Sequence, residues 1–125
     1  MEAHCPFCNL PKERVWFDSQ DSLAILDGFP LTTGHTLVIP RRHVGSIFEL
    51  PQEELTHLSA VVAKVRKILK AKYQPDAFNI RINDGPAAGQ TIPHAHIHVI
   101  PRKAGDVPDP RGGIRWIFPD KAKYW

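Results

Sequence analysis

The sequence predicts an α+β fold in which an antiparallel sheet packs against one long helix. One segment repeats apolar residues at helical spacing, and several short segments are rich in β-forming residues and bounded by turn residues. Two of these strand-like segments follow each other through a loop of small residues, which suits antiparallel neighbours. The 125 residues, 42% of them hydrophobic, are expected to form a single domain with an irregular tail over 106–125.

The first half of the chain is expected to supply two strands and a helical turn. Residues 22–26 predict a strand that ends at the turn beginning with Asp27. Residues 36–39 predict a second strand, which stops at Pro40 because proline donates no backbone hydrogen bond. A short helical turn is expected over 44–49.

The long helix is expected over 51–73. Pro51 suits a first-turn position, acidic residues follow it, and lysines gather near the other end. Its apolar residues recur at spacings of three and four, which predicts one buried face. They are Leu55, Leu58, Val62, Val65 and Leu69.

The last two strands are expected over 77–82 and 94–100. The loop between them, 83–90, is rich in glycine and alanine, so its backbone can approach a ligand closely. In the first of these strands the apolar residues alternate to one side: Phe78, Ile80 and Ile82.

Three histidines stand at alternate positions: His94, His96 and His98. Successive side chains of a strand point to opposite faces, so the three imidazoles are expected to share one face. The apolar residues between them would then face the core. Imidazole can act as nucleophile, proton carrier or metal ligand near neutral pH, so the row predicts a site.

Charge and composition limit the partners. The net charge of +3, from 16 basic and 13 acidic residues, suits a small anionic ligand and is too weak to argue for nucleic acid. No apolar run reaches the ~20 residues of a membrane span. The first residues lack the order of a secretion signal, so a cytoplasmic protein without a membrane partner is expected. The aromatic residues of the tail are expected to pack on the domain or on a partner subunit.

Cys5 and Cys8 form the chain's CxxC pair. Without a secretion signal this pattern indicates metal binding or redox chemistry before a structural disulfide. With no second CxxC, histidines would have to complete a metal site.

Residues 83–102 read NDGPAAGQTIPHAHIHVIPR, and residues 34–40 read GHTLVIP. The first contains the pattern His-φ-His-φ-His-φ-φ, with φ apolar, after a loop of the form Asn-x-Gly…Ala-Gly-Gln-Thr. Together they resemble the histidine triad (HIT) superfamily, most of all the fragile-histidine-triad hydrolases and their bacterial relatives. The resemblance implies a sheet of about five strands with one long and one short helix, and a sheet that continues across a homodimer.

The resemblance further implies a hydrolase or transferase acting on the α-phosphate of a purine nucleotide. His96 would be the nucleophile that forms a nucleotidyl-histidine intermediate. His98 would bind phosphate oxygens, His94 would orient the site or assist proton transfer, and His35 would support the triad. For His35, a purely structural role stays open.

Nucleotide-binding roles carry over in the same way. Asp27 would accept the ribose hydroxyls, although it could also be a plain turn residue. Phosphate donors are expected at Asn83, Gly89, Gln90 and Thr91, together with His98. Phe7, Leu26 and Phe29 are candidates for the base pocket.

Some HIT proteins hold a structural zinc, and the matching positions here are Cys5, Cys8, His43 and His94. His94 would then be a ligand, which leaves His96 and His98 for chemistry. Reduced thiols packed under the sheet and a solvent-exposed His43 are the alternative. No organic cofactor is expected.

The favoured activity is cleavage of dinucleoside polyphosphates such as diadenosine tetraphosphate or triphosphate. A purine nucleoside phosphoramidase would use the same intermediate with an amine as leaving group. A nucleotide-binding signalling protein with incidental turnover, and an enzyme acting on adenylylated DNA, are further alternatives.

Overall fold

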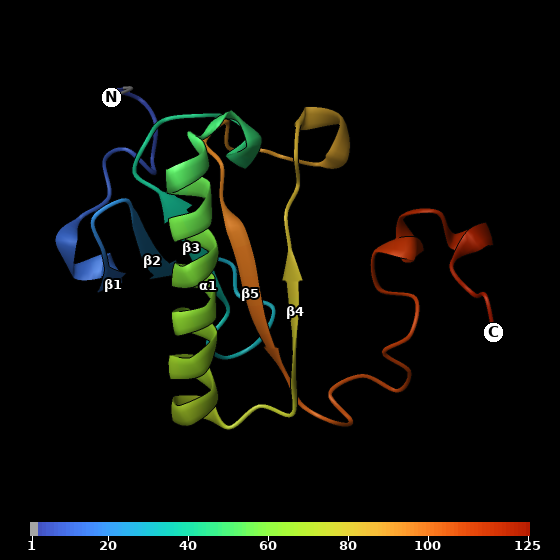
Figure 1. Ribbon diagram of the computed structural model, residues 1–125. Helices are drawn as coiled ribbons and strands as arrows, with labels where there is room; N and C mark the ends of the chain where they lie inside the picture. The colour runs from blue at the N-terminus through green and yellow to red at the C-terminus, as the bar shows by residue number, and fades with distance from the viewer. Residues whose placement is uncertain (1–2) are drawn as a thin grey trace.

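The computed structural model describes residues 3–125, which form a five-stranded antiparallel sheet crossed by one long helix, α1 (Figure 1). The strand order is β1-β2-β3-β5-β4, and every neighbouring pair is antiparallel. The strands are β1 (Val15–Asp18), β2 (Ser22–Leu26), β3 (Thr36–Pro40), β4 (Ala77–Arg81) and β5 (Ile97–Arg102). The α+β prediction is therefore confirmed.

The strand predictions are confirmed for β2 and need correction elsewhere. β1 was not foreseen. β3 includes Pro40, which pairs with Ser22. β4 ends one residue early, at Arg81, and β5 runs over Ile97–Arg102 in place of the predicted 94–100. Before Ile97 the backbone bonds to a loop, since the Ala95 N–H donates to the Val44 carbonyl at 2.7 Å.

α1 (Gln52–Tyr73) matches its prediction within one residue. It ends where Gln74 turns left-handed (φ 53°) and donates its N–H to the Lys70 carbonyl at 3.0 Å. The expected helical turn over 44–49 is a shorter 3₁₀ turn, Ile47–Glu49, in which the Ser46 hydroxyl accepts the Phe48 N–H and the Glu49 carboxylate accepts the Ser46 N–H.

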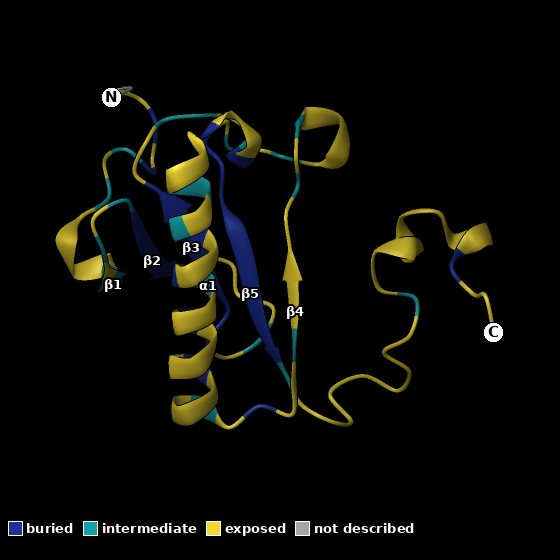
Figure 2. Ribbon diagram, viewed as in Figure 1, coloured by how far each residue is buried: buried dark blue, intermediate teal, exposed yellow. Residues whose placement is uncertain are grey.

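The inner strands of the sheet, β2, β3 and β5, are buried on both faces. The buried face of α1 packs on one side, with Leu58, Val61, Val65 and Leu69 against Ala24, Val38 and Val99. The N-terminal segment covers part of the other side with Cys5 and Phe7, which pack against Leu23, Ile25, Leu37 and Ile39. Central β5 is accordingly buried along its length, whereas edge strand β4 is largely exposed (Figure 2).

The tail leaves the sheet after β5 and stands beyond β4, away from α1 (Figure 1). It contains two 3₁₀ turns, Gly113–Ile117 and Pro119–Lys121. Its aromatic residues do not pack on the sheet: the Arg111 guanidinium lies 4.2 Å from the ring centre of Trp125, and Trp116 is 47% exposed. Within residues 3–125, no helix has the length and apolar character that a membrane span requires.

Candidate functional site

The three alternating histidines form a row on the sheet face opposite α1. The ring centroids of His96 and His98 are 5.2 Å apart, and the Phe7 ring makes edge contacts with both His94 and His96. The intervening residues lie in the core under α1: Ala95, Ile97 and Val99. The alternation of faces is thus confirmed, although only His98 belongs to β5.

His96 keeps its Nε2 available. Its Nδ1 lies 2.8 Å from the main-chain oxygen of His94. A carbonyl oxygen can only accept, so Nδ1 carries a proton, and in the neutral form of the ring the lone pair is on Nε2. At 9% exposure His96 is the most accessible of the three rings. A fixed neutral imidazole of this kind can attack an electrophile.

His98 adopts the opposite tautomer to His96, with its proton on Nε2. The Leu31 N–H donates to His35 Nδ1 at 3.0 Å, so the proton of His35 resides on Nε2. This Nε2 lies 3.0 Å from His98 Nδ1 and 3.2 Å from Asp27 Oδ2. His98 Nδ1 therefore accepts, and His98 Nε2 carries a proton that can be donated to a ligand.

Burial keeps both rings of this pair neutral. Burial, together with the nearby positive charge of Arg81, lowers the pKa of His98 to about 4. Burial likewise lowers the pKa of His35, against the opposing effect of the Asp27 carboxylate. Because both rings are uncharged near neutral pH, neither forms an ion pair with Asp27. The His35 Nε2–H lies 3.2 Å from Asp27 Oδ2, whereas the unprotonated Nδ1 of His98 lies 3.7 Å from that oxygen and makes no hydrogen bond with it.

Asp27 follows β2 directly and joins the histidine network to a turn. Its Oδ1 accepts the Phe29 N–H at 2.8 Å, while Oδ2 faces His35. Asp27 is thus a turn residue, as the alternative interpretation expected, and its carboxylate also lies beside the histidines.

Arg81 belongs to this face and was missed in the sequence. It pairs directly with His98 across β4 and β5, so the two side chains leave the sheet on the same side. Its charge lowers the pKa of both His98 and His35. The signal was available, since the alternation of Phe78 and Ile80 toward one side of β4 places Arg81 on the other.

The glycine-rich loop is held closed by Gln90. Its Oε1 accepts the Gly85 N–H at 2.8 Å, and its Nε2 donates to the carbonyls of Gly45 and Ile92 at 2.9 and 3.0 Å. Gly89 has φ 98°, a conformation that favours glycine, and lies against the amide of Asn83. Thr91 is exposed at the end of the loop.

Cys5, Cys8, His43 and His94 converge at the N-terminal end of the histidine row, with one ligand atom each inside 4.8 Å. Neighbouring donors lie close: Cys8 Sγ is 3.2 Å from His43 Nδ1, and His94 Nδ1 is 3.4 Å from Cys5 Sγ. A tetrahedral ion with bonds of about 2.0–2.3 Å requires donor separations of roughly 3.3–3.8 Å.

The chemistry of these donors also fits a metal. His94 donates its Nε2 proton to the Pro40 carbonyl at 2.8 Å, so its Nδ1 turns a lone pair toward the two sulfurs. Burial raises the pKa of the Cys5 thiol, and a bound cation would offset the cost of the thiolate there. These four side chains therefore suit Zn²⁺.

The predicted base pocket needs one correction. Phe7 lies beside His96 as expected, and Phe29 is 91% exposed. Leu26, however, continues the side of β2 that carries Ala24 and lines a cavity against α1. Ile25, which the sequence reasoning missed, lies on the histidine side.

Comparison with known proteins agrees with the geometry. The sequence profile described as HIT domain matches residues 10–105. The bis(5'-nucleosyl)-tetraphosphatase [asymmetrical] of Schizosaccharomyces pombe is 42% identical over 93 residues, which are 74% of this chain and 51% of that protein. The bifunctional bis(5'-adenosyl)-triphosphatase/adenylylsulfatase FHIT of Arabidopsis thaliana is 40% identical, with 83% of this chain and 57% of that protein covered. This chain thus spans only about half the length of these two relatives.

A solved structure, that of a Zn-bound histidine triad family protein from Mycobacterium smegmatis, has the same fold. It is 35% identical, with a TM-score of 0.74, and the match covers 95% of this chain and 94% of that one.

Proposed function

Because this chain belongs to the histidine triad (HIT) family, we propose that it cleaves dinucleoside polyphosphates, of the diadenosine tetraphosphate or triphosphate type, at the α-phosphate. The observation that carries the proposal is the pair of tautomers in the row. His96 offers a lone pair at Nε2, and the adjacent His98 offers a proton at Nε2.

In the first step, His96 Nε2 attacks the α-phosphorus. The N–P bond forms as the bond from phosphorus to the bridging oxygen breaks, and the leaving polyphosphate departs with that electron pair. The proton of His96 stays on Nδ1 and is donated to the His94 carbonyl oxygen, and this hydrogen bond stabilises the positive imidazole of the intermediate. The His98 N–H donates to an equatorial phosphate oxygen, where charge is spread in the transition state.

In the second step, a water molecule attacks the same phosphorus. The P–N bond breaks, its electrons return to Nε2, and the water loses one proton to solvent or to the departing phosphate. The products are a nucleoside monophosphate and a nucleoside polyphosphate, and His96 is restored.

Arg81 favours a polyphosphate leaving group over an amine. It is exposed on edge strand β4 directly opposite His98, so its guanidinium can reach phosphates beyond the one under attack. Guanidinium binds phosphate oxygens in a bidentate manner. A phosphoramidate offers no such group on its leaving side.

The remaining contacts hold the nucleoside. Asp27 accepts the ribose hydroxyls at Oδ2, and Phe7 with Ile25 provides an apolar surface for the base. Asn83 and Thr91 are the side-chain donors to the α-phosphate. The Gly89 N–H already donates to the Pro86 carbonyl at 3.0 Å, so Gly89 contributes by letting the loop backbone turn close to the phosphate. Since Gln90 already has three backbone partners, it acts by shaping this loop.

We further propose that Cys5, Cys8, His43 and His94 hold a structural zinc. When bound, the ion supplies a cross-link between the N-terminal segment and the histidine row. His94 then serves as a ligand, and its main-chain oxygen positions His96. Two free thiols in such a site suit the reducing cytoplasm.

A homodimer through the β4 edge is part of the proposal. β4 leaves one side of its backbone unpaired and exposes Ile80 (47%), which is a liability for a lone subunit. The exposed aromatic residues of the tail would pack on the second subunit. Sedimentation should give the mass of two chains.

The test is to trap the intermediate. Diadenosine tetraphosphate is mixed with the protein, quenched in base and analysed by mass spectrometry for one added adenylyl group. The adduct should form in the natural protein and be absent from His96→Ala. His57→Gln, which alters a surface histidine on α1 that contacts Asp21, is the matched control and should retain it. Two results would refute the mechanism: hydrolysis by His96→Ala, or hydrolysis by the natural protein without any adenylyl adduct.

A further inference from the structure

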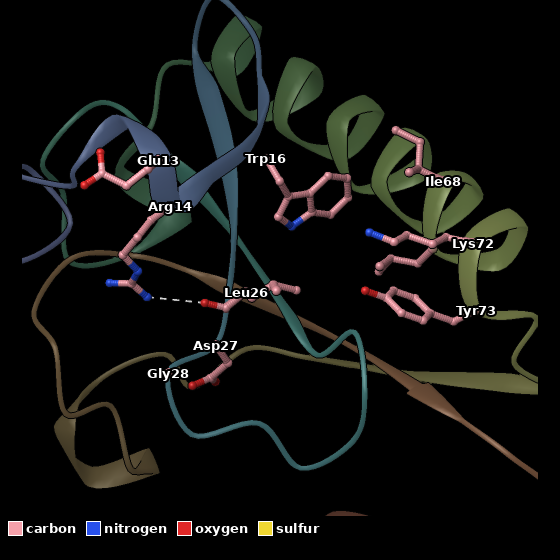
Figure 3. Close-up of a pocket in the computed structure, with 10 residues that line it drawn as sticks. Glu13, Arg14, Trp16, Leu26, Asp27, Gly28, Ile68, Lys72 and Tyr73 are labelled. Atoms are coloured by element: carbon pink, nitrogen blue, oxygen red, sulfur yellow. Dashed lines mark hydrogen bonds between the residues drawn. The ribbon is translucent and has the colours of Figure 1, made fainter.

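A separate cavity of about 590 Å³ lies on the other side of the sheet, between α1 and the start of β1 and end of β2. Its walls are mainly apolar, with Trp16 and Leu26 from the strands and Ile68 and Leu69 from α1 (Figure 3). Its volume lies within the range of roughly 300–1,000 Å³ that is typical of small-molecule sites. Asp27 is the one lining residue that the proposed nucleotide site also uses, and it stands at the end of β2 between the two sites.

Three hydrogen-bond donors line this cavity, and none of them has an acceptor in the part of the chain that the structure describes. The Trp16 Nε1–H is buried and has no hydrogen-bond partner among residues 3–125. The Lys72 ammonium and the Tyr73 hydroxyl point from α1 toward Trp16 and Leu26 (Figure 3). The only contact the described residues give Lys72 is the face of the Tyr73 ring, 5.3 Å from Nζ to the ring centre.

A buried N–H without a partner is costly, and a ligand that supplies an acceptor removes this cost. The two acidic residues of the lining do not serve that purpose. Asp27 is engaged by Phe29 and His35, and Glu13 lies at the far end of the cavity from Lys72 (Figure 3). Neither carboxylate of the lining therefore pairs with the indole, the hydroxyl or the ammonium group.

We propose that this cavity binds a planar aromatic acid. The ring system lies between Trp16 and the apolar side chains of Leu26 and Ile68. The carboxylate accepts from the Trp16 indole, the Tyr73 hydroxyl and the Lys72 ammonium, and it pairs with the lysine charge. This site is distinct from the nucleotide face, because Leu26 and Trp16 belong to the helix side of the sheet.

The test uses 2-naphthoate as the probe and its uncharged analogue 2-naphthamide as the comparison. The chain has three tryptophans, so ¹⁵N-labelled protein gives three indole signals, and Trp16→Phe identifies that of Trp16. Titration with 2-naphthoate should shift this signal with a dissociation constant on the order of 100 μM. Lys72→Gln should weaken binding about tenfold, as should replacing the acid by the amide.

Two controls locate the effect. Lys67→Gln removes an exposed lysine from the same helix and should bind 2-naphthoate as the natural protein does. His96→Ala should also bind it unchanged, which separates this site from the nucleotide site and from the proposed hydrolysis. The amide spectrum of Lys72→Gln reports whether that variant is folded. A Trp16 signal that stays fixed up to the solubility limit of the probe, or equal affinity for acid and amide, would overturn the proposal.

Discussion

The low pKa of His98 makes the stability of the protein depend on pH in a calculable way. Folding lowers this pKa from 6.5 to about 4, chiefly by burial. The unfolded chain therefore binds a proton at His98 more readily than the folded one, and the stability present above pH 6.5 is lost as the pH falls toward 4. Between about pH 7.5 and about pH 5, this one residue should lower the free energy of unfolding by about 2 kcal/mol.

The measurement is urea unfolding of the natural protein and of His98→Asn at both pH values. Asparagine does not titrate, so the variant should lose about 2 kcal/mol less on acidification than the natural protein. Burial also lowers the pKa of His35 and His94, but both remain in the variant and cancel in the difference. Equal losses in the two proteins would refute the claim that His98 is buried in its neutral form.

Three further predictions address the substrate, the metal and the fold. Arg81→Gln should raise KM for diadenosine tetraphosphate about tenfold and leave cleavage of adenosine phosphoramidate unchanged, as initial rates with both substrates would show; an equal effect on both would remove Arg81 from the leaving-group side. His43→Ala should abolish the one equivalent of zinc expected by atomic emission analysis and lower Tm; unchanged metal content would place the ion elsewhere. Gly34 has φ 89°, and a Cβ there would lie 2.8 Å from the Tyr73 ring, so Gly34→Ala should cost about 2 kcal/mol in urea unfolding. Gly28→Ala, with open space around it, should be neutral, and similar losses in both variants would contradict this reasoning.

The fold was predictable where side-chain patterns are regular. The apolar spacing of α1 and the β-rich run of β2 gave bounds that the structure confirms or moves by one residue. β1 was missed because it has four residues and a register shift between Val15 and Phe17, which erases the two-residue period. The start of β5 was placed too early because His94 and His96 keep strand-like alternation while their backbone bonds outside the sheet.

The composition of the site was predictable in part, and its protonation was not. Motif and spacing singled out the histidines and the CxxC pair. Which nitrogen carries each proton depends on main-chain oxygens of His94 and Pro40 and on the N–H of Leu31, none of which has a sequence signal. Arg81 was overlooked because a charged residue on a strand ordinarily indicates a solvated edge.

His94 belongs to two sites through different atoms. Its ring nitrogen Nδ1 faces the two thiols, while its main-chain oxygen accepts a hydrogen bond from His96 Nδ1. A substitution of the side chain leaves that oxygen in place, whereas any shift of the backbone around residue 94 moves both groups together. Under the proposed mechanism, changes in the CxxC segment therefore alter turnover without contacting the nucleotide, because a proposed ligand of the metal also positions the proposed nucleophile.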